Sequence, residues 1–480
     1  MPLGAADNEN IVADICVIGA DPAGIAVATA AAAFGRSVVL IERHQLGSAA
    51  PGQGSLPART LAAVGNRAQA MRTAPLLGIA AREPEIDPRT INAHVQSVLT
   101  EAAANFGVER FAGLGIRVIP TSGRFINRKT VVAGEYRIRA RRFVIATGSV
   151  PSIPSIQGLV NVPYLTTETV FGSNDRLHNL IIIGNGRTAI ELAQTYSRLG
   201  SRVVVLERGK ALAEEDPELA KFVLDHLAAE GVAVHENAKI DSVEGGLGRV
   251  RAHVTLDGEQ HVVEGSHLLL VAGRKPATSE LGLEAAGIRH DERGIKVNAG
   301  LKTTNRRVFA VGDVAAGLPP AEAADYYASV VVRRALLHVR ARVDTELVPR
   351  VVFTDPELAY VGLTEAEASK RGRKVHVLRW PYRENARALS ERTLAGHVKV
   401  LTSRDGKILG AGIVGARASE LIGMWSLAIS QGLNIKAMTE WVPPYPALSE
   451  INKSVATSYY AATPTKPTLR KVIDFLARFG

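Results

Sequence analysis

The sequence carries the same five-part pattern twice, and this duplication constrains the fold more than any other feature. Residues 14–42 contain an apolar run, a glycine turn, an alanine-rich helix, a second apolar run and a final acid, Glu42. Residues 180–207 repeat this order and end at Glu207. In both copies 23 positions separate the first glycine from the acid (19 to 42 and 184 to 207). Equal spacing in two copies predicts two α/β domains of the same kind.

Each copy has the features of a dinucleotide site. Glycines let the backbone turn tightly and approach a pyrophosphate, the helix N-terminus faces the phosphates, and the acid binds ribose hydroxyls. The second copy has a complete G-x-G-x-x-A turn at residues 184–189. In the first copy Asp21 stands where the second glycine is expected, bringing a Cβ atom and a negative charge. We therefore expect two different nucleotides, the first of them at an imperfect turn.

Composition limits the class of protein. A chain of 480 residues, 46% of them apolar, is long enough for two to four domains. No apolar run reaches the roughly 18 residues of a membrane span, and the first ten residues lack the pattern of a signal peptide. The charge of +10 comes from small scattered basic groups, which argues against nucleic acid and suits anionic cofactors. The single cysteine, Cys16, is expected in the core and fits a cytoplasmic protein.

Two further parts follow the repeated patterns. Apolar strands are predicted within residues 267–276 and 308–314. From about residue 348 the alternation of strands and helices changes and is typical of a separate α+β domain. Residues 469–479 form an amphipathic pattern, which we expect to be a helix packed on the body of its own chain. The histidines have no partners at metal-ligand spacing, so no metal site is expected.

Four longer segments carry a resemblance to a known family. They read ATGSVPSIPSIQG (146–158), VFAVGDV (308–314), VVFTDPELAYVGLTEAEA (351–368) and ILGAGIVGARASELI (408–422). Over about residues 12–460 the chain resembles the pyridine nucleotide-disulfide oxidoreductases, which include dihydrolipoamide dehydrogenase, mercuric reductase and soluble transhydrogenase. The resemblance implies an α/β fold with two Rossmann-like domains and a C-terminal α+β dimerisation domain.

The same resemblance implies the domain limits and the cofactors. The expected parts are an FAD-binding domain in two pieces (1–150 and 276–347), an NAD(P)-binding domain (151–275) and a dimerisation domain (348–480) that makes a homodimer. FAD would be bound by Gly19, Asp21, Ala23, Gly24, Glu42, Arg43, Ala146, Thr147, Gly148, Gly312 and Asp313. The NAD or NADP molecule would be bound by Gly184, Gly186, Arg187, Glu207, Gly273 and Arg274.

Two of the nicotinamide-site residues leave alternatives open. Glu207 favours NAD over NADP, because a carboxylate suits a free 2′-hydroxyl and repels a 2′-phosphate. The adjacent Arg208 opposes that preference. Arg187 falls where disulfide reductases often place a gating tyrosine over the flavin. It is either a cation that attracts a phosphate or an anionic acceptor, or a solvated residue at a helix start, and the sequence favours neither.

The residues that define the family's redox chemistry are missing. Residues 47–59 read GSAAPGQGSLPAR, with Ala50 and Ser55 at the positions of the two redox cysteines. Without these thiols, disulfide reduction by the family mechanism is excluded. Arg59 stands at the family's lysine position and would pair with Glu191 beside the flavin. Because the arginine side chain ends in a planar and permanently charged guanidinium group, the replacement of the family's lysine by Arg59 is not conservative.

The C-terminal motif also departs from the family. Tyr445 replaces the histidine that serves the thiol as acid and base, whereas Glu450 remains. An unperturbed tyrosine titrates near pH 10, so it is a poor base near neutrality and a usable hydrogen-bond donor. Soluble transhydrogenase, by the same resemblance, also has a tyrosine here and lacks a working cysteine pair. The implied dimer would bring Tyr445 and Glu450 of one subunit near the flavin of the other.

These observations lead to one main hypothesis and one rival. The main hypothesis is an FAD-dependent NAD(P)H oxidoreductase, similar to a diaphorase or a transhydrogenase. Its small-molecule electron acceptor would be a quinone, a second nicotinamide nucleotide or a dye. The rival is a catalytically impaired relative that acts as a nucleotide-responsive binding or scaffold protein. This rival is motivated by the several positions at which the sequence departs from the family's motifs. The candidate catalytic residues are Arg59, Glu191, Tyr445 and Glu450.

Overall fold

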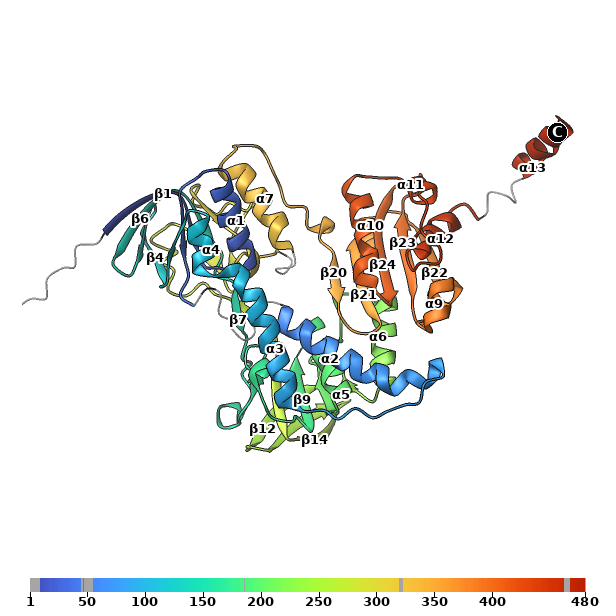
Figure 1. The fold of residues 1–480 in the computed structure, drawn as a ribbon, viewed down its shortest axis with the longest axis horizontal. Helices are drawn as coiled ribbons and strands as arrows, with labels where there is room; N and C mark the ends of the chain where they lie inside the picture. Colours follow the sequence, from blue (N-terminus) through green and yellow to red (C-terminus); the bar gives the residue numbers. More distant parts are fainter. Residues whose placement is uncertain are drawn as a thin grey trace, which may run out of the picture.

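The computed structural model describes residues 9–44, 46, 55–184, 186–318, 323–461 and 467–479. Its strands and helices group into lobes around separate sheets (Figure 1). The described helices are α1 (Pro22–Ala33), α2 (Leu56–Thr73), α3 (Pro88–Ala103), α4 (Val108–Gly113), α5 (Arg187–Arg198), α6 (Pro217–Ala229), α7 (Ala324–Ala335), α8 (Glu365–Lys370), α9 (Ala386–Glu391), α10 (Ala418–Ser430), α11 (Ile435–Glu440), α12 (Glu450–Ser458) and α13 (Pro467–Leu476).

The first lobe is built on a seven-stranded sheet in the order β3-β2-β1-β6-β5-β4, with β19 also paired to β6. Its strands are β1 (Glu9–Ile18), β2 (Val38–Ile41), β3 (Ile116–Ile119), β4 (Gly123–Asn127), β5 (Thr130–Ala133), β6 (Tyr136–Ile145) and β19 (Val308–Ala310). Strands β1, β2, β3, β6 and β19 run parallel to one another, whereas β5 pairs antiparallel with β6. The apolar run of β2 follows from burial on both faces. Since β19 comes late in the chain, this lobe draws on two distant parts of the sequence.

The second lobe contains the other copy of the repeated pattern. Its parallel sheet has the order β11-β10-β9-β15-β8 and lies beside an antiparallel sheet, β12-β13-β14. The strands are β8 (Leu165–Thr166), β9 (Asn179–Gly184), β10 (Arg202–Leu206), β11 (Ala233–His235), β12 (Lys239–Gly246), β13 (Arg249–Leu256), β14 (Glu259–Gly265) and β15 (His267–Val271). A ribbon of β7 (Ser149–Pro151) and β16 (Arg274–Pro276) joins the first two lobes. A short pair, β17 (His290–Asp291) and β18 (Gly294–Ile295), follows it.

The third lobe is an antiparallel sheet in the order β20-β21-β24-β23-β22, with α10, α11 and α12 packed on it. Its strands are β20 (Arg350–Val352), β21 (Glu357–Gly362), β22 (His376–Pro381), β23 (His397–Thr402) and β24 (Ile408–Gly415). The fold class is therefore the α/β fold with a C-terminal α+β domain that the sequence predicts. Among the described residues, no helix is long and apolar enough to span a membrane.

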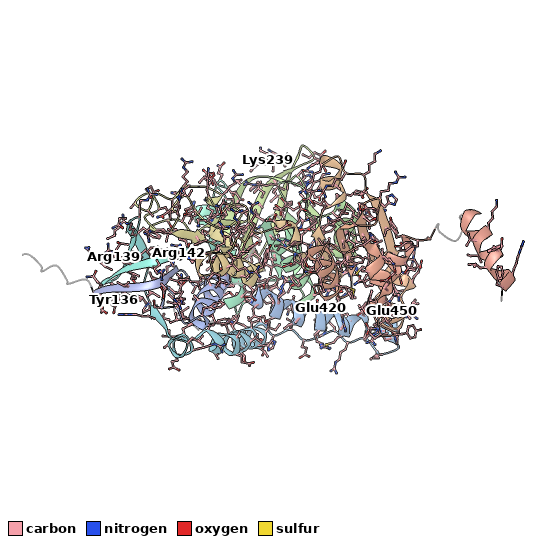
Figure 2. The ribbon with its side chains drawn as sticks, turned by 90° about the horizontal axis from the view of Figure 1, so that it is seen from above. Tyr136, Arg139, Arg142, Lys239, Glu420 and Glu450 are labelled. Carbon is pink, nitrogen blue, oxygen red and sulfur yellow. The ribbon has the colours of Figure 1, made fainter. Side chains whose placement is uncertain are left out.

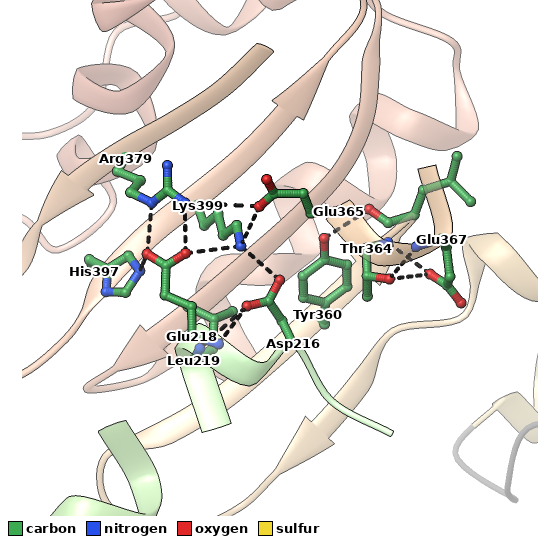
Figure 3. Close-up of polar contacts among 11 residues, drawn as sticks. Asp216, Glu218, Leu219, Tyr360, Thr364, Glu365, Glu367, Arg379, His397 and Lys399 are labelled. Atoms are coloured by element: carbon green, nitrogen blue, oxygen red, sulfur yellow. Dashed lines mark hydrogen bonds and ion pairs between the residues drawn. The ribbon is translucent and has the colours of Figure 1, made fainter. Parts of the chain in front are cut away.

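A cluster of charges around the buried pair of Lys399 and Asp216 joins the second and third lobes (Figure 3). The Lys399 ammonium lies 2.9 Å from Asp216 and 3.0 Å from both Glu218 and Glu365. Lys399 and Asp216 are 3% and 2% exposed. Glu218 also accepts hydrogen bonds of 2.7 Å from Arg379, whose side chain lowers the pKa of Glu218 to about 2. These contacts fix α6 against the C-terminal sheet.

The C-terminal helix is the clearest difference from expectation. A helix forms at Pro467–Leu476, but its apolar side chains are exposed rather than packed on the body of the chain. Val472, Ile473, Phe475 and Leu476 are between 52% and 58% exposed. The expected packing is therefore wrong for this structure. An amphipathic pattern identifies the apolar face of a helix and carries no information about the surface that covers it.

Candidate functional site

The first glycine turn packs tightly against the end of β6. Gly19 has φ +94, and a Cβ atom there would overlap the carbonyl oxygen of Ala146. A Cβ atom on Gly24 would lie 2.6 Å from that of Ala146. Both glycines are therefore required for packing alone, because any side chain would push α1 away from the sheet. Ala23, on the same turn of α1, is buried.

Asp21 occupies the N-terminus of α1. Its Oδ1 accepts a hydrogen bond of 2.7 Å from the Gly24 N–H, so the carboxylate caps the helix. Its Oδ2 lies where a Cβ atom of Gly312 would be, and its Cβ lies against Gly148. Burial, together with the charges of Asp313 and Glu42, raises the pKa of Asp21 to about 7. The side chain thus takes the position of the anion that a helix N-terminus attracts.

Some of the other predicted FAD-site residues lie close to Asp21 and others do not. Glu42 accepts hydrogen bonds from the N–H groups of Ala20 (2.7 Å) and His44 (2.8 Å), so its carboxylate faces the turn. The hydroxyl of Thr147 donates to the carbonyl of Ala277 (2.8 Å). Arg43 is exposed and donates to the His44 ring (3.0 Å). The structure therefore brings Glu42 to the turn and leaves Arg43 at the surface.

Asp313 belongs to a chain of contacts that the sequence did not reveal. Its Oδ2 accepts a hydrogen bond of 2.6 Å from Ser149, and the Ser149 hydroxyl accepts one of 2.7 Å from Arg274. Arg274 also donates to Glu168 at 3.0 Å. Arg274, predicted for the nicotinamide nucleotide, therefore lies on the ribbon between the two lobes. Ser149 follows the Ala-Thr-Gly segment directly, and that position was its only signal.

The second glycine turn is more open. A Cβ atom on Gly184 would lie 2.6 Å from the Val271 carbonyl oxygen, whereas one on Gly186 would meet nothing within 4 Å. Gly186 has φ +89 and Gly273 has φ +90. Glu207 is 4% exposed and accepts a hydrogen bond of 3.0 Å from the Gly209 N–H. Burial raises the pKa of Glu207. This turn has the space and the acid that a nucleotide needs; residue 185 lies outside the described part.

Arg187 is engaged with other parts of the protein. Its Nε lies 3.8 Å from Glu215, and its Nη1 donates to the Val351 carbonyl at 3.3 Å. The Arg187 side chain is 20% exposed and that of Glu215 is 1% exposed. Arg187 therefore links α5 to β20, an arrangement that matches neither the solvated residue nor the anion-attracting cation considered from the sequence.

Arg59 of α2 and Glu191 of α5 form an ion pair at the junction of the second and third lobes. Arg59 Nη2 donates to Glu191 Oε2, and Glu191 Oε1 accepts a hydrogen bond of 2.8 Å from the Phe353 N–H. The Arg59 guanidinium lies 4.0 Å from the centre of the Phe353 ring. The Glu191 side chain is 7% exposed. The structure therefore brings together Arg59 and Glu191, the two residues that the resemblance implied to lie beside the flavin. Phe353 contacts both of them and was not identified from the sequence.

No thiol lies near this junction. Cys16 is 0% exposed in β1, and burial raises the pKa of its thiol. Ser55 is exposed at the start of α2, and Ala50 lies outside the described residues. Among the described residues, no group of three or more His, Cys, Asp and Glu side chains has the arrangement of a metal site.

The C-terminal candidates lie in a different lobe from the glycine turns. Tyr445 is 79% exposed. Glu450 Oε2 accepts a hydrogen bond of 3.1 Å from the Ala447 N–H at the start of α12. Figure 2 places Glu450 in the C-terminal part of the molecule. A single chain does not bring Tyr445 and Glu450 to the first turn.

Comparison with known families decides the relationship. Residues 13–332 match the pyridine nucleotide-disulphide oxidoreductase family, and residues 348–456 match the dimerisation domain of the same family. This chain belongs to the pyridine nucleotide-disulphide oxidoreductase family. It therefore carries that family's dimerisation domain, and members of the family bind FAD and NAD(P)H.

Curated relatives span almost the whole chain. A mercuric reductase from Bacillus cereus is 31% identical over 447 residues, which cover 92% of this chain and 71% of the relative. A dihydrolipoyl dehydrogenase from Bacillus subtilis (strain 168) is 31% identical over 458 residues, covering 93% and 96%. Among solved structures, LpdA from Mycobacterium tuberculosis has a TM-score of 0.84 at 25% identity, covering 94% of this chain and 99% of that one. RclA from Escherichia coli, a flavoprotein disulfide reductase, has a TM-score of 0.78 at 25% identity, covering 92% and 99%.

The family's two cofactors fit this chain to different degrees. The second turn is open at Gly186 and ends with the buried Glu207, which suits NAD(P)H. At the first turn, Gly19 and Gly24 let α1 pack closely on the end of β6, which is the backbone arrangement of a dinucleotide turn. Asp21 holds the helix N-terminus, and its carboxylate must move before a pyrophosphate can take that position. FAD therefore fits the residues of its site once the Asp21 side chain has moved.

Proposed function

We propose that this chain is an FAD-dependent NAD(P)H oxidoreductase that passes electrons to an acceptor other than a disulfide. The observation that carries the proposal is the state of its one cysteine, which is buried inside β1 with a raised pKa. The thiolate is the reactive form of cysteine, so Cys16 is unsuited to accept electrons. Disulfide, lipoamide and mercuric reduction through a redox cysteine pair are thereby excluded for this chain.

The residues present support the remaining chemistry. Gly19, Gly24 and Glu42 would hold the adenosine end of FAD, and Thr147 and Asp313 would lie toward its flavin end. When bound, FAD supplies a carrier that accepts a hydride from a nicotinamide. Gly184, Gly186 and Glu207 would bind the nicotinamide nucleotide.

The pair of Arg59 and Glu191 is proposed as the electrostatic element of the site. Arg59 contributes a guanidinium group with several N–H donors in a fixed plane. Glu191 holds its guanidinium on the Phe353 ring, so the positive charge has a fixed orientation. A fixed charge stabilises a developing negative charge without reorganising in the reaction. We assign this role to Arg59, and we assign to Glu191 the task of positioning it.

The acceptor is proposed to be a small molecule reached from the surface. A quinone, a second nicotinamide nucleotide or a dye would accept electrons directly, as a diaphorase or transhydrogenase would require. The exposed Tyr445 hydroxyl would donate a hydrogen bond to that acceptor across a homodimer interface. A single buried cysteine is compatible with the cytoplasmic location expected from the sequence.

A steady-state assay with several acceptors tests this proposal. NADH or NADPH oxidation is followed with a soluble quinone, with the second nicotinamide nucleotide and with a disulfide such as oxidised lipoamide. We expect turnover with at least one of the first two acceptors and none with the disulfide. Turnover confined to the disulfide would overturn the proposal.

The rival function rests on Asp21. Because its carboxylate caps α1 and approaches Gly312, the chain in this conformation resists FAD while its second turn remains open. A protein that binds NAD(P)H, retains no flavin and turns over no acceptor would be a nucleotide-responsive binding protein. Equilibrium binding of NADH to flavin-free protein, combined with the assay above, distinguishes the two functions.

A further inference from the structure

A hollow of about 390 Å³ lies in the first lobe, away from the two glycine turns. We call it the basic hollow and define it by Asp14, Phe34, Arg36, Arg141, Arg142 and Leu337. Phe34 follows the last residue of α1, whereas Asp21 precedes its first. A helix of 12 residues is about 18 Å long, so the basic hollow and the first turn lie at opposite ends of α1.

Positive charge in the basic hollow exceeds the negative charge that it contains. Three arginines and one acid line it. Asp14 lies 3.3 Å from Arg141, and it also accepts hydrogen bonds from the Ser37 N–H and hydroxyl. Arg36 belongs partly to the helix end, because its Nε donates to the Phe34 carbonyl at 3.2 Å. Cations at a helix C-terminus are favourable on their own, so Arg36 alone would not indicate a ligand.

The position of Arg142 is not explained by the C-terminus of a helix. It comes from β6 rather than from a helix end, and its Nη1 donates to the Arg141 carbonyl at 3.0 Å. Its Nε is buried and has no hydrogen-bond partner among the described residues. Burial and the charges of Arg307 and Arg141 lower the pKa of Arg142. A cation among cations is unfavourable, and an anion bound at the terminal nitrogens of Arg142 would relieve this repulsion.

The residues that line the basic hollow indicate which kind of chemical group carries the anion. Phe34 and Leu337 are 54% and 49% exposed, so each offers an apolar surface beside the arginines. His338 adds a polar ring at the same wall. The volume lies within the range of small-molecule sites, which combine apolar walls with a few placed polar groups. Guanidinium groups favour phosphate because two N–H groups can bind two oxygens of one ligand.

We propose that the basic hollow binds a small molecule with a phosphate group on a compact apolar or planar body. The phosphate would contact Arg142 and Arg36, and the body would lie against Phe34 and Leu337. The site is distinct from both dinucleotide turns and does not depend on the proposed oxidoreductase function. A ligand here would join the C-terminal ends of α1 and α7 to β6 and would stabilise the first lobe by mass action.

The test uses phenyl phosphate as the probe, with the full chain saturated with NADH so that the second turn is occupied. Calorimetry measures binding to the unmodified protein, Arg142→Gln and the control Arg139→Gln. Arg139 lies on the same strand as Arg142 (Figure 2). It is exposed and is not among the residues that line the basic hollow. We expect affinity to fall at least tenfold in Arg142→Gln and to stay within twofold in Arg139→Gln. Equal losses in the two variants, or no binding to the unmodified protein, would overturn the proposal.

Two further comparisons cover the remaining outcomes. Arg36→Gln changes an exposed residue, so it tests the site even where Arg142→Gln fails to fold, and we expect a loss of affinity of at least threefold. Phenol and inorganic phosphate separate the two parts of the ligand. We expect no binding of phenol and at least fivefold weaker binding of inorganic phosphate. Equal affinity for inorganic and phenyl phosphate would contradict the apolar part of the proposal.

Discussion

The Asp21 Oδ1 lies 2.7 Å from the backbone nitrogen of Gly24 and accepts its hydrogen bond. The residue that breaks the dinucleotide fingerprint therefore serves as the N-cap of the helix whose terminus would face the pyrophosphate. Its second oxygen approaches Gly312, on the opposite side of the site. In this position Asp21 competes with FAD for the same helix N-terminus.

Replacing Asp21 by glycine should tighten FAD binding. The substitution removes a charge that opposes the pyrophosphate and restores the space of a glycine turn, at a cost of a few tenths of a kcal/mol for the lost cap. We expect a gain of at least tenfold in affinity, or about 1.4 kcal/mol, measured by fluorescence titration of apoprotein. Asp87→Gly is the matched control, since Asp87 caps α3 in the same way. Unchanged or weaker affinity would mean that the loop is built around the aspartate.

FAD binding should also depend on pH. Burial and nearby acids raise the pKa of Asp21 to about 7 in the folded protein, against about 3.9 in an unfolded chain. This raised pKa contributes stability that is full below pH 4 and is lost as pH rises through 7. The neutral form does not repel a pyrophosphate, so FAD affinity should fall about tenfold from pH 6 to pH 8. Asp21→Gly should abolish the slope; a slope that persists would assign it to another group.

Removing the carboxylate of Glu191 should affect both stability and hydride transfer. Glu191→Gln leaves the Arg59 cation without its partner, and we expect a loss of about 1–3 kcal/mol in the free energy of unfolding. Flavin reduction by NADH should slow about tenfold, because the guanidinium loses its fixed orientation. Urea unfolding and stopped-flow absorbance measure the two effects. The control Glu83→Gln changes an ion pair with Arg72 in which the acid is exposed, and it should cost less stability than Glu191→Gln. Flavin reduction that is unaffected in Glu191→Gln would remove Glu191 from the proposed site.

Tyr445→Phe should separate the two half-reactions. Tyr445 is exposed in the single chain, so its hydroxyl is not needed for the fold of that chain. The variant should slow reoxidation of the flavin by a quinone more than it slows reduction by NADH. Rapid mixing, with each half-reaction observed separately, measures both rates. An equal loss in the two would argue against a role for Tyr445 at the acceptor.

The buried cluster around Lys399 should be important for stability. Lys399→Met removes the cation that pairs with the buried Asp216, whereas Glu218 keeps its contact with Arg379. We expect a loss of about 3 kcal/mol in the free energy of unfolding. The control is Lys221→Met, because Lys221 pairs with Asp225 on the exposed face of the neighbouring helix α6. That variant should cost less than about 0.5 kcal/mol. Similar losses in the two variants would show that burial does not strengthen the cluster.

The sequence predicted the parallel core well for a simple physical reason. Buried parallel strands are rich in apolar residues, so the second apolar run of each repeated pattern corresponds to a strand, β2 in the first copy and β10 in the second. The antiparallel strands β12, β13 and β14 were missed. They alternate polar and apolar residues, and β14 is largely exposed, so they lack that signal.

The site shows the same division between local and long-range signals. An aspartate followed by proline begins α3 and α6, and this pair is a helix-start signal that the local sequence supplies. The same pair begins α1 at Asp21 and Pro22. There Asp21 was interpreted as a defect in the dinucleotide-binding motif, so its role as the N-cap of the helix was not predicted. The contact of Arg187 with Val351 joins residues far apart in the chain. Nothing in the local sequence specifies such a contact.

The absorption spectrum of the purified protein, recorded without oxygen before and after addition of NADH and then NADPH, tests the central claim most directly. We expect a bound flavin whose visible absorption bleaches with one of the two nucleotides and returns when a quinone is added. A protein with reconstituted FAD that stays oxidised in an excess of both nucleotides would contradict the claim.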